Sequence, residues 1–227
     1  GLDLMPKVDA SMAATLPKAD AYHALRRDFP LLEKMIAEGY TGRKGKGGFY
    51  RLNKDNGARV KEAIDLATGD YAPAAKVSLG SVSAARKGGP KALVAHADKG
   101  GQLAWAVMSQ VLAYAASLVP EIADDVPSVD RALRTGYNWK FGPFELLDKI
   151  GAGYVAERLA EEGRDVPALL QKAAEAEGFY RVADGRLQYL TVEGSYADVE
   201  RGEGVLLLAD VKLKSEPLAK NGSASLW

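Results

Sequence analysis

The sequence predicts a mainly α protein with minor short β segments, built from a helical unit that occurs twice. Gly48-Phe49-Tyr50-Arg51 and Gly178-Phe179-Tyr180-Arg181 are the same peptide, and each copy follows a helical pattern that starts at a glycine. Apolar residues three or four positions apart recur over long stretches, which is typical of helices, whereas strand-like segments are few and short. A repeated peptide in a repeated setting indicates a duplicated helical domain.

Composition and charge limit the class of protein. The chain has 227 residues, of which 47% are hydrophobic, so it can bury a sizeable core. Thirty basic residues balance thirty acidic ones, so no net field draws nucleic acid, and we expect no nucleic-acid partner. No apolar run reaches the roughly 18 residues that a membrane span needs. The absence of cysteine excludes disulfides and thiolate metal sites and agrees with a cytoplasmic protein.

The first quarter of the chain is predicted to hold short helices followed by a loop. Apolar residues at helical spacing run from Met5 to Gly39, and Pro17 and Pro30 divide this region. Five glycines between positions 39 and 48 then end the helical pattern. We expect a loop there that leads into a short extended segment at 49–52.

The second quarter is predicted to be a connector. Residues 53–101 are rich in Ala, Lys, Gly and Ser, and the only helix expected among them covers Val60 to Leu66. The predicted division is therefore the C-terminal part of a first helical copy at 1–54, a connector at 55–98, a second helical copy at 99–200 and a tail at 201–227.

The second half is predicted to begin with a long buried helix at 102–123. Its apolar face consists of Leu103, Val107, Val111, Leu112, Ala115, Leu118 and Ile122. A helix at 129–135 should stop at Gly136, and a third should start at Gly142-Pro143, where proline fits the first helical position. A helical pattern at 155–174, broken near Gly163, precedes two short strands at 179–182 and 187–192 that are joined by a turn.

One segment of the predicted loop could bind an anion. Arg43, Lys44 and Lys46 stand among four glycines in Thr41-Gly42-Arg43-Lys44-Gly45-Lys46-Gly47-Gly48. Exposed amides and cationic side chains together can hold a phosphate. The segment fits neither the Walker template nor the dinucleotide fingerprint, and a solvated basic turn is the alternative interpretation.

Other candidate residues have plain structural explanations. His23 and His96 stand in no ligand or catalytic spacing, so we expect no metal site. Four carboxylates follow the long helix, at Glu121, Asp124, Asp125 and Asp130; we expect them to be solvated or capping, with Asp130 capping the next helix or lying in its first turn. The aromatic residues of 137–141 indicate a packed corner. The residue types therefore show no catalytic constellation.

Three segments carry a resemblance to a known family. GLDLMPKVDAS, GYTGRKGKGGFYRL and AYAASLVPEIADDVPSVDRALRTGYNWKFGPFELLDKIG resemble the C-terminal helical region of the long bacterial 3-hydroxyacyl-CoA dehydrogenases, the fused enzymes of fatty-acid β-oxidation. The resemblance implies a Rossmann domain that binds NAD, two helical domains like the C-terminal domain of 6-phosphogluconate dehydrogenase, and a crotonase domain in the same polypeptide. It also implies an acyl-CoA substrate and a thiolase subunit as partner.

The resemblance places the family's catalytic residues outside this chain. The NAD-binding loop and the catalytic His–Glu pair belong to the N-terminal portion, and a further Asn belongs to the first helical copy. Ser109 and Gln110 stand near the position of that Asn in the second copy. We therefore expect an excised fragment that is inactive alone, has no cofactor-binding or metal-binding residue, and ends in a tail that leads to an absent crotonase domain.

Two roles and two alternatives follow. The second copy is expected to pair with the first, and Arg43, Lys44 and Lys46 are the residues expected to contact the CoA phosphates. The alternative is a non-enzymatic helical module that serves assembly. A third interpretation makes the basic loop a free-standing phosphate or nucleotide site.

Overall fold

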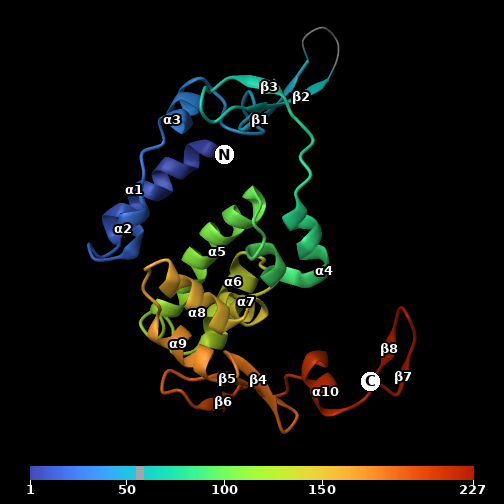
Figure 1. Cartoon of the computed structure of the whole chain (residues 1–227). Coiled ribbons are helices and arrows are strands. Elements are labelled where there is room, and N and C mark those ends of the chain that lie inside the picture. Colours follow the sequence, from blue (N-terminus) through green and yellow to red (C-terminus); the bar gives the residue numbers. More distant parts are fainter. Residues whose placement is uncertain (55–58) are drawn as a thin grey trace. The chain divides into compact units, whose positions relative to one another are not determined.

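The computed structural model describes residues 1–54 and 59–227. The chain divides into two compact units, Gly1–Val77 and Ser78–Trp227, called here the first and the second unit. Residues 55–58, which open the predicted connector, lie outside the described residues. The described residues form helices and only short antiparallel strands (Figure 1). The predicted mainly α class with minor β segments is confirmed, and the likeness to 6-phosphogluconate dehydrogenase stays a prediction.

The first unit consists of short helices followed by a three-stranded antiparallel sheet of order β1-β2-β3. Its helices begin where the sequence provides a start: the side chain of Asp20 accepts a hydrogen bond from the Tyr22 amide at 2.8 Å, and Pro30 opens α3. The elements are η1 (Leu2–Leu4), α1 (Met5–Thr15), α2 (Ala21–Leu25), α3 (Pro30–Ala37), β1 (Tyr50–Asn53), β2 (Val60–Ile64) and β3 (Tyr71–Pro73).

The helix predicted at 60–66 is wrong, because Val60–Ile64 is the central strand β2. The misleading residue is Glu62, which is only 8% exposed and whose carboxylate lies 2.6 Å from Nε of Arg51 on β1. A charged residue at an inward position hides the alternation of apolar and polar residues that marks a strand.

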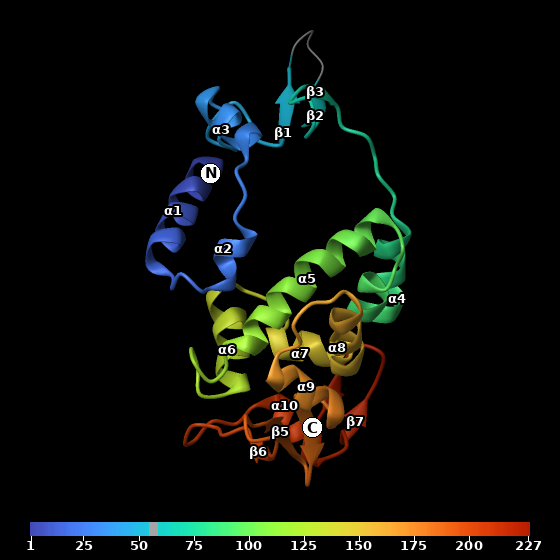
Figure 2. The same ribbon diagram turned by 60° about the vertical axis from the view of Figure 1, so that its left-hand side comes forward.

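The second unit packs helices above a second three-stranded sheet of order β4-β5-β6 (Figures 1 and 2). Its core centres on Phe144 and Phe179, both fully buried, whose ring centroids lie 4.8 Å apart. The elements are α4 (Gly80–Val94), α5 (Lys99–Ser117), α6 (Val126–Gly136), α7 (Pro143–Ile150), α8 (Ala152–Glu161), α9 (Ala168–Glu175), β4 (Tyr180–Ala183), β5 (Arg186–Leu190), β6 (Tyr196–Asp198), α10 (Leu208–Lys214), β7 (Ala219–Lys220) and β8 (Ser225–Leu226).

Most predicted elements of the second unit are confirmed, and two predictions need correction. The helix α4 occupies part of the segment expected to be a connector. The long helix α5 ends at Ser117, before Pro120, and its buried face carries Trp105, Ser109, Leu112 and Ala116. Four residues of the face predicted to be buried are instead exposed, namely Leu103, Val107, Val111 and Ile122. The repeating apolar pattern therefore identified the helix correctly and the buried face only in part.

The two sheets are built alike around the repeated peptide. The amide of Ile64 donates to the Phe49 carbonyl at 3.0 Å, and the amide of Leu190 donates to the Phe179 carbonyl at 2.8 Å. In each sheet a tyrosine of the third strand donates its hydroxyl hydrogen to the carbonyl of the repeat's glycine at 2.7 Å: Tyr71 to Gly48, and Tyr196 to Gly178. The repeated peptide thus marks a repeated three-stranded meander.

Candidate functional site

The basic loop of the first unit is a turn whose tip carries two cations. The Gly45 amide donates to the Gly42 carbonyl at 3.0 Å, which places Arg43 and Lys44 at the two central positions of a β-turn. Both side chains are exposed. Lys46 lies apart from them, with Nζ 5.9 Å from the centre of the Tyr40 ring. The structure therefore brings two of the three predicted binding residues together.

The amides of this loop are largely used within it. Gly42 donates to the Gly47 carbonyl, and Lys46 donates to the Gly39 carbonyl. The Gly48 amide donates to the Tyr50 carbonyl. An anion at the turn would therefore depend on the side chains of Arg43 and Lys44 more than on a cradle of free amides.

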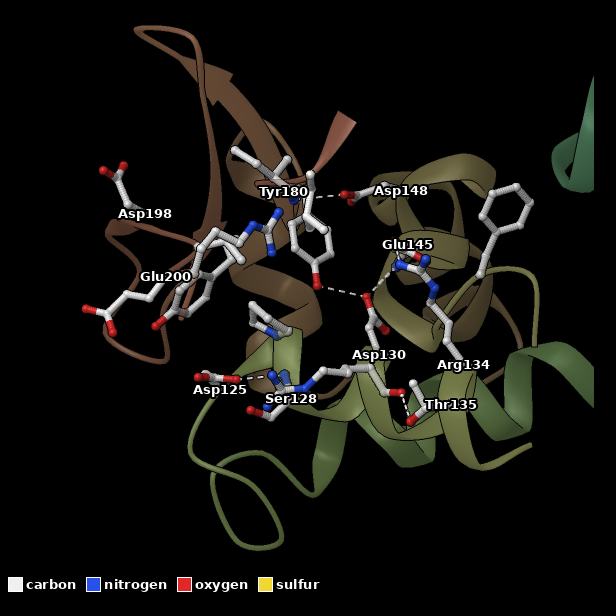
Figure 3. Close-up of a pocket in the computed structure, with 18 of the residues that line it drawn as sticks. Asp125, Ser128, Asp130, Arg134, Thr135, Glu145, Asp148, Tyr180, Asp198 and Glu200 are labelled. Carbon is white, nitrogen blue, oxygen red and sulfur yellow. Dashed lines mark hydrogen bonds and ion pairs between the residues drawn. The ribbon is translucent and has the colours of Figure 1, made fainter. Parts of the chain in front are cut away.

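The second unit contains a broad pocket of about 1360 Å³. Figure 3 shows Tyr180 pointing at Asp130 from one side, with Arg134 and Glu145 beside them. The lining comes from α6, α7 and the β4–β6 sheet and includes the cations Arg131, Arg134, Lys140, Lys149 and Arg201.

Asp130 is the most buried charged residue of this pocket, at 3% exposure. Its carboxylate accepts hydrogen bonds from the amides of Phe144 and Glu145 at 2.8 and 3.1 Å and from the Tyr180 hydroxyl at 2.9 Å. Burial raises the pKa of Asp130 to about 6, although the three donors favour the charged form. Asp130 on α6 thus caps the N-terminus of α7.

The cap comes from a neighbouring helix because the N-cap residue of α7 is Gly142, which has no side chain. A Cβ built on Gly142 would lie 2.2 Å from Oδ1 of Asp130. Glu145 completes the start of α7 by accepting from the Gly142 amide at 2.8 Å. The close approach of the Asp130 carboxylate to the start of α7 therefore requires glycine at position 142.

Asp148 plays the same kind of role at the start of β4. Its two carboxylate oxygens accept from the amides of Phe179 and Tyr180 at 2.7 and 2.8 Å. Burial raises the pKa of Asp148 to about 6, and burial is also the main cause of the raised pKa of Tyr180. These groups hold elements of the second unit together.

The structure confirms the capping role expected for Asp125 and corrects the place expected for Asp130. Asp125 caps α6 by accepting from the Ser128 amide at 2.8 Å, as a capping carboxylate should. Asp130 lies in the middle of α6 and caps the following helix α7. The sequence signal for this arrangement is a helix that starts at Gly142-Pro143 without an N-cap side chain of its own, so the acceptor has to come from elsewhere.

Ser109 and Gln110, near the position expected for the family's Asn, are both engaged by one arginine. The guanidinium of Arg164 donates to Oγ of Ser109 at 2.7 Å and to Oε1 of Gln110 at 3.2 Å. Ser109 is 1% exposed. Both side chains therefore hold α5 to the segment that follows α8.

Several kinds of site are not found in residues 1–54 and 59–227. These residues contain no group of three or more His, Asp or Glu side chains that could hold a metal ion. Every strand pair among them is antiparallel. The described residues therefore contain no parallel βαβ unit of the kind that binds NAD. None of the helices described in these ranges has the length and apolar character to cross a bilayer.

Comparison with known proteins gives relatives of one kind. The chain is 34% identical over 202 residues, or 86% of its length, to a Bacillus subtilis protein provisionally named 3-hydroxyacyl-CoA dehydrogenase. It is 37% and 34% identical over 147 residues, or 65% of its length, to proteins of Rickettsia felis and Rickettsia prowazekii provisionally named fatty acid oxidation complex trifunctional enzyme. No family model and no solved structure matches.

The chain spans only a fifth to a quarter of the length of these relatives, 20% of each Rickettsia protein and 25% of the Bacillus protein. Such coverage agrees with the expected fragment of a multifunctional enzyme. Over most of its own length, the chain is thus a relative of the 3-hydroxyacyl-CoA dehydrogenases and trifunctional enzymes of fatty acid oxidation, as its motifs predict.

Proposed function

We propose that this chain is the helical part of an NAD-dependent 3-hydroxyacyl-CoA dehydrogenase of fatty-acid β-oxidation, in which it supplies domain pairing and part of the substrate cleft. The observation that carries the proposal is the 34% identity over 86% of the chain to the Bacillus subtilis protein of that name. In the longer protein the Rossmann domain holds NAD, a crotonase domain lies in the same polypeptide, and a thiolase subunit is a partner. The enzyme is cytoplasmic.

The chain alone is proposed to be inactive. Its buried carboxylates cap α7 and β4, and Arg164 engages Ser109 and Gln110. These contacts support a structural role for the second unit. The test is to incubate the chain with NAD and a 3-hydroxyacyl-CoA and to follow NADH absorbance, with the full-length protein as positive control. Turnover by the chain alone would overturn the proposal.

The basic turn is proposed to contact the phosphates of CoA. Its two tip cations, Arg43 and Lys44, are exposed and adjacent, which suits a phosphate, and Lys46 contributes from the side. We expect Arg43→Ala with Lys44→Ala to weaken CoA binding in calorimetric titration of the full-length protein. The exposed cations Arg86 and Lys87 on α4 supply a matched control pair. Equal loss in both double variants would remove the turn from the substrate site.

A helical assembly module without chemistry is the second candidate. It is favoured by an exposed apolar row on α5, where Leu103, Val107 and Val111 are 66, 55 and 39% exposed at four-residue spacing. Dehydrogenase activity in the full-length protein would decide against this candidate. An inactive full-length protein in which this row still drives self-association would decide for it.

A further inference from the structure

The aromatic corner predicted at 137–141 lines the pocket of the second unit. Asn138 adopts a positive φ of 56°, which turns the chain out of α6 after the helix has ended at Gly136. The next three residues, Trp139, Lys140 and Phe141, all belong to the lining of the pocket. Trp139 and Phe141 are half-buried, and Lys140 is exposed. The corner thus places a cation between two aromatic side chains.

Two ammonium groups share the ring of Phe141. Nζ of Lys149, at the end of α7, lies 4.3 Å from the centre of this ring, and Nζ of Lys140 lies 5.3 Å from it. Neither lysine forms an ion pair within residues 1–54 and 59–227. Like charges that are held close to one ring repel each other. An anion that bound both ammonium groups would relieve this repulsion.

All but one of the carboxylates in the lining of this pocket already have a partner among backbone amides or guanidinium groups. The partnered ones are Asp125, Asp130, Glu145, Asp148 and Asp198. Glu200 is the exception among the described residues, and Figure 3 shows it on the side of the pocket away from Arg134. These partnered carboxylates hold the fold together, and they leave other cations of the pocket without a counter-charge.

The cations of the pocket are in excess once the ion pairs are set aside. Arg134 lies 3.1 Å from the carboxylate of Glu145, and Arg201 lies 2.7 Å from that of Asp210. In the described part of the chain, the cations of the lining that have no carboxylate partner are Arg131, Lys140 and Lys149. Three unpaired cations therefore stand against the single unpaired carboxylate of Glu200. This balance favours an anionic ligand.

The ring of Trp139 is open to a ligand. Among residues 1–54 and 59–227 no aromatic ring packs on it, no cation lies over it and no acceptor meets its indole N–H. Nucleic-acid bases stack on aromatic rings of this kind. The pocket volume of about 1360 Å³ exceeds the range of about 300–1,000 Å³ that is usual for small-molecule sites. The pocket thus has room for a flat ring together with phosphate groups.

We propose that this pocket of the second unit binds a nucleoside diphosphate. The base stacks on Trp139, and the two phosphates lie between the ammonium groups of Lys140 and Lys149. Arg131 on α6 provides a further cation, whose planar guanidinium suits phosphate oxygens. The proposal does not depend on the proposed enzymatic role.

The test is calorimetric titration of the full chain with ADP, with adenosine and with inorganic pyrophosphate. ADP is expected to bind at least tenfold more tightly than either of its parts. Lys140→Ala with Lys149→Ala should weaken the binding of ADP and of pyrophosphate at least tenfold. Lys87 and Lys99 are exposed and lie outside the pocket, so Lys87→Ala with Lys99→Ala is the matched control and should change both affinities less than twofold.

Trp139→Leu separates the ring from the phosphates. This variant should weaken ADP at least fivefold and leave the affinity for pyrophosphate within twofold of the wild-type value. CoA, which also contains an adenosine diphosphate group, distinguishes the source of the ligand. Loss of both ADP and CoA binding in the Lys140 and Lys149 double variant assigns the pocket to this group within CoA, and loss of ADP binding alone assigns it to a free nucleotide.

Three results would overturn the proposal. The first is the absence of saturable ADP binding by the wild type. The second is an equal loss of ADP binding in the two lysine double variants, because the effect would then be one of overall charge. The third is pyrophosphate that binds as tightly as ADP together with an unchanged ADP affinity in Trp139→Leu. Circular dichroism checks that the exposed lysine changes leave the fold intact.

Discussion

The guanidinium carbon of Arg51 lies 4.1 Å from the centre of the Tyr71 ring. Arg181 repeats this contact on Tyr196 at 3.9 Å. The arginines differ in their hydrogen-bonded partner on the middle strand, which is the carboxylate of Glu62 at 2.6 Å for Arg51 and the amide oxygen of Gln188 at 3.0 Å for Arg181. Across the strands the same arrangement is therefore held by a charged pair in one unit and by a neutral partner in the other, where Glu177 also lies 3.9 Å from the Arg181 guanidinium.

We expect Glu62→Gln to be tolerated, because it copies the pair of Arg181 with Gln188. Its cost in the free energy of unfolding should stay below about 1 kcal/mol, whereas Arg51→Ala leaves the buried carboxylate of Glu62 without its cation and should cost about 2–3 kcal/mol. Hydrogen exchange of the β2 amides reports on the first unit directly. Equal destabilisation by both variants would contradict this account of the pair.

Gly142→Ala should destabilise the second unit by about 1–3 kcal/mol. The new methyl group would meet the carboxylate of Asp130, so either the cap of α7 or the position of α6 must give way. Urea denaturation measures the effect. The control is Gly136→Ala at the end of α6, where a Cβ meets nothing within 4 Å, and this change should be neutral or slightly stabilising. A neutral Gly142→Ala would show that the close approach is not needed.

Asp148→Ala should cost about 1–3 kcal/mol, because the amides of Phe179 and Tyr180 lose their acceptor in a largely buried place. The loss should appear as faster exchange of these two amides and as a lower midpoint in urea. Asp124, which is exposed in the turn before α6, provides the matched control, and Asp124→Ala should change neither quantity. Slow exchange in Asp148→Ala would mean that another group caps the strand.

The buried carboxylate of Asp130 predicts a pH dependence of stability. Its pKa of about 6 in the folded protein lies above the value of about 3.9 in an unfolded chain. The folded state therefore holds the proton more tightly, and the stabilisation is complete below about pH 3.9 and is lost as the pH rises through 6. The loss amounts to at most about 3 kcal/mol.

Asp130→Asn should remove the part of the pH dependence that Asp130 causes, because an amide does not titrate, whereas Asp148, whose pKa is also raised to about 6, titrates in both proteins. The measurement is the free energy of unfolding between pH 4 and 7, taken as the difference between the wild type and the variant. We expect the wild type to lose stability relative to Asp130→Asn as the pH rises, while Asp124→Asn follows the wild-type curve. A constant difference between the wild type and Asp130→Asn would contradict the raised pKa.

The sequence was sufficient for the parts of the fold that depend on local patterns. The start of α7 at Pro143, the break near Gly163 and the two strands after Gly178 follow from proline and glycine placement and from alternation. The strand β2 could not be recognised, since its inward residue is a charged one whose partner lies on another strand. Such a pairing is visible only in three dimensions.

The candidate site was predicted in part for the same reason. Arg43 and Lys44 lie side by side in a turn, which the flanking glycines Gly42 and Gly45 predict. Asp130 and Asp148 were not recognisable as caps of distant elements, because the groups they hold are 14 or more residues away along the chain. Ser109 and Gln110 were placed near a family position, but the guanidinium that engages them comes from beyond α8.

Because Asp130 of α6 caps the N-terminus of α7, the two helices also depend on each other during folding. A helix that carries its own cap can form and fray by itself, whereas α7 has its first amides satisfied only when Asp130 is in place. The two helices should consequently open and close as one cooperative unit, and a truncation that ends between them would leave both halves unfolded. Any useful boundary for dissecting this protein must therefore lie outside residues 125–150.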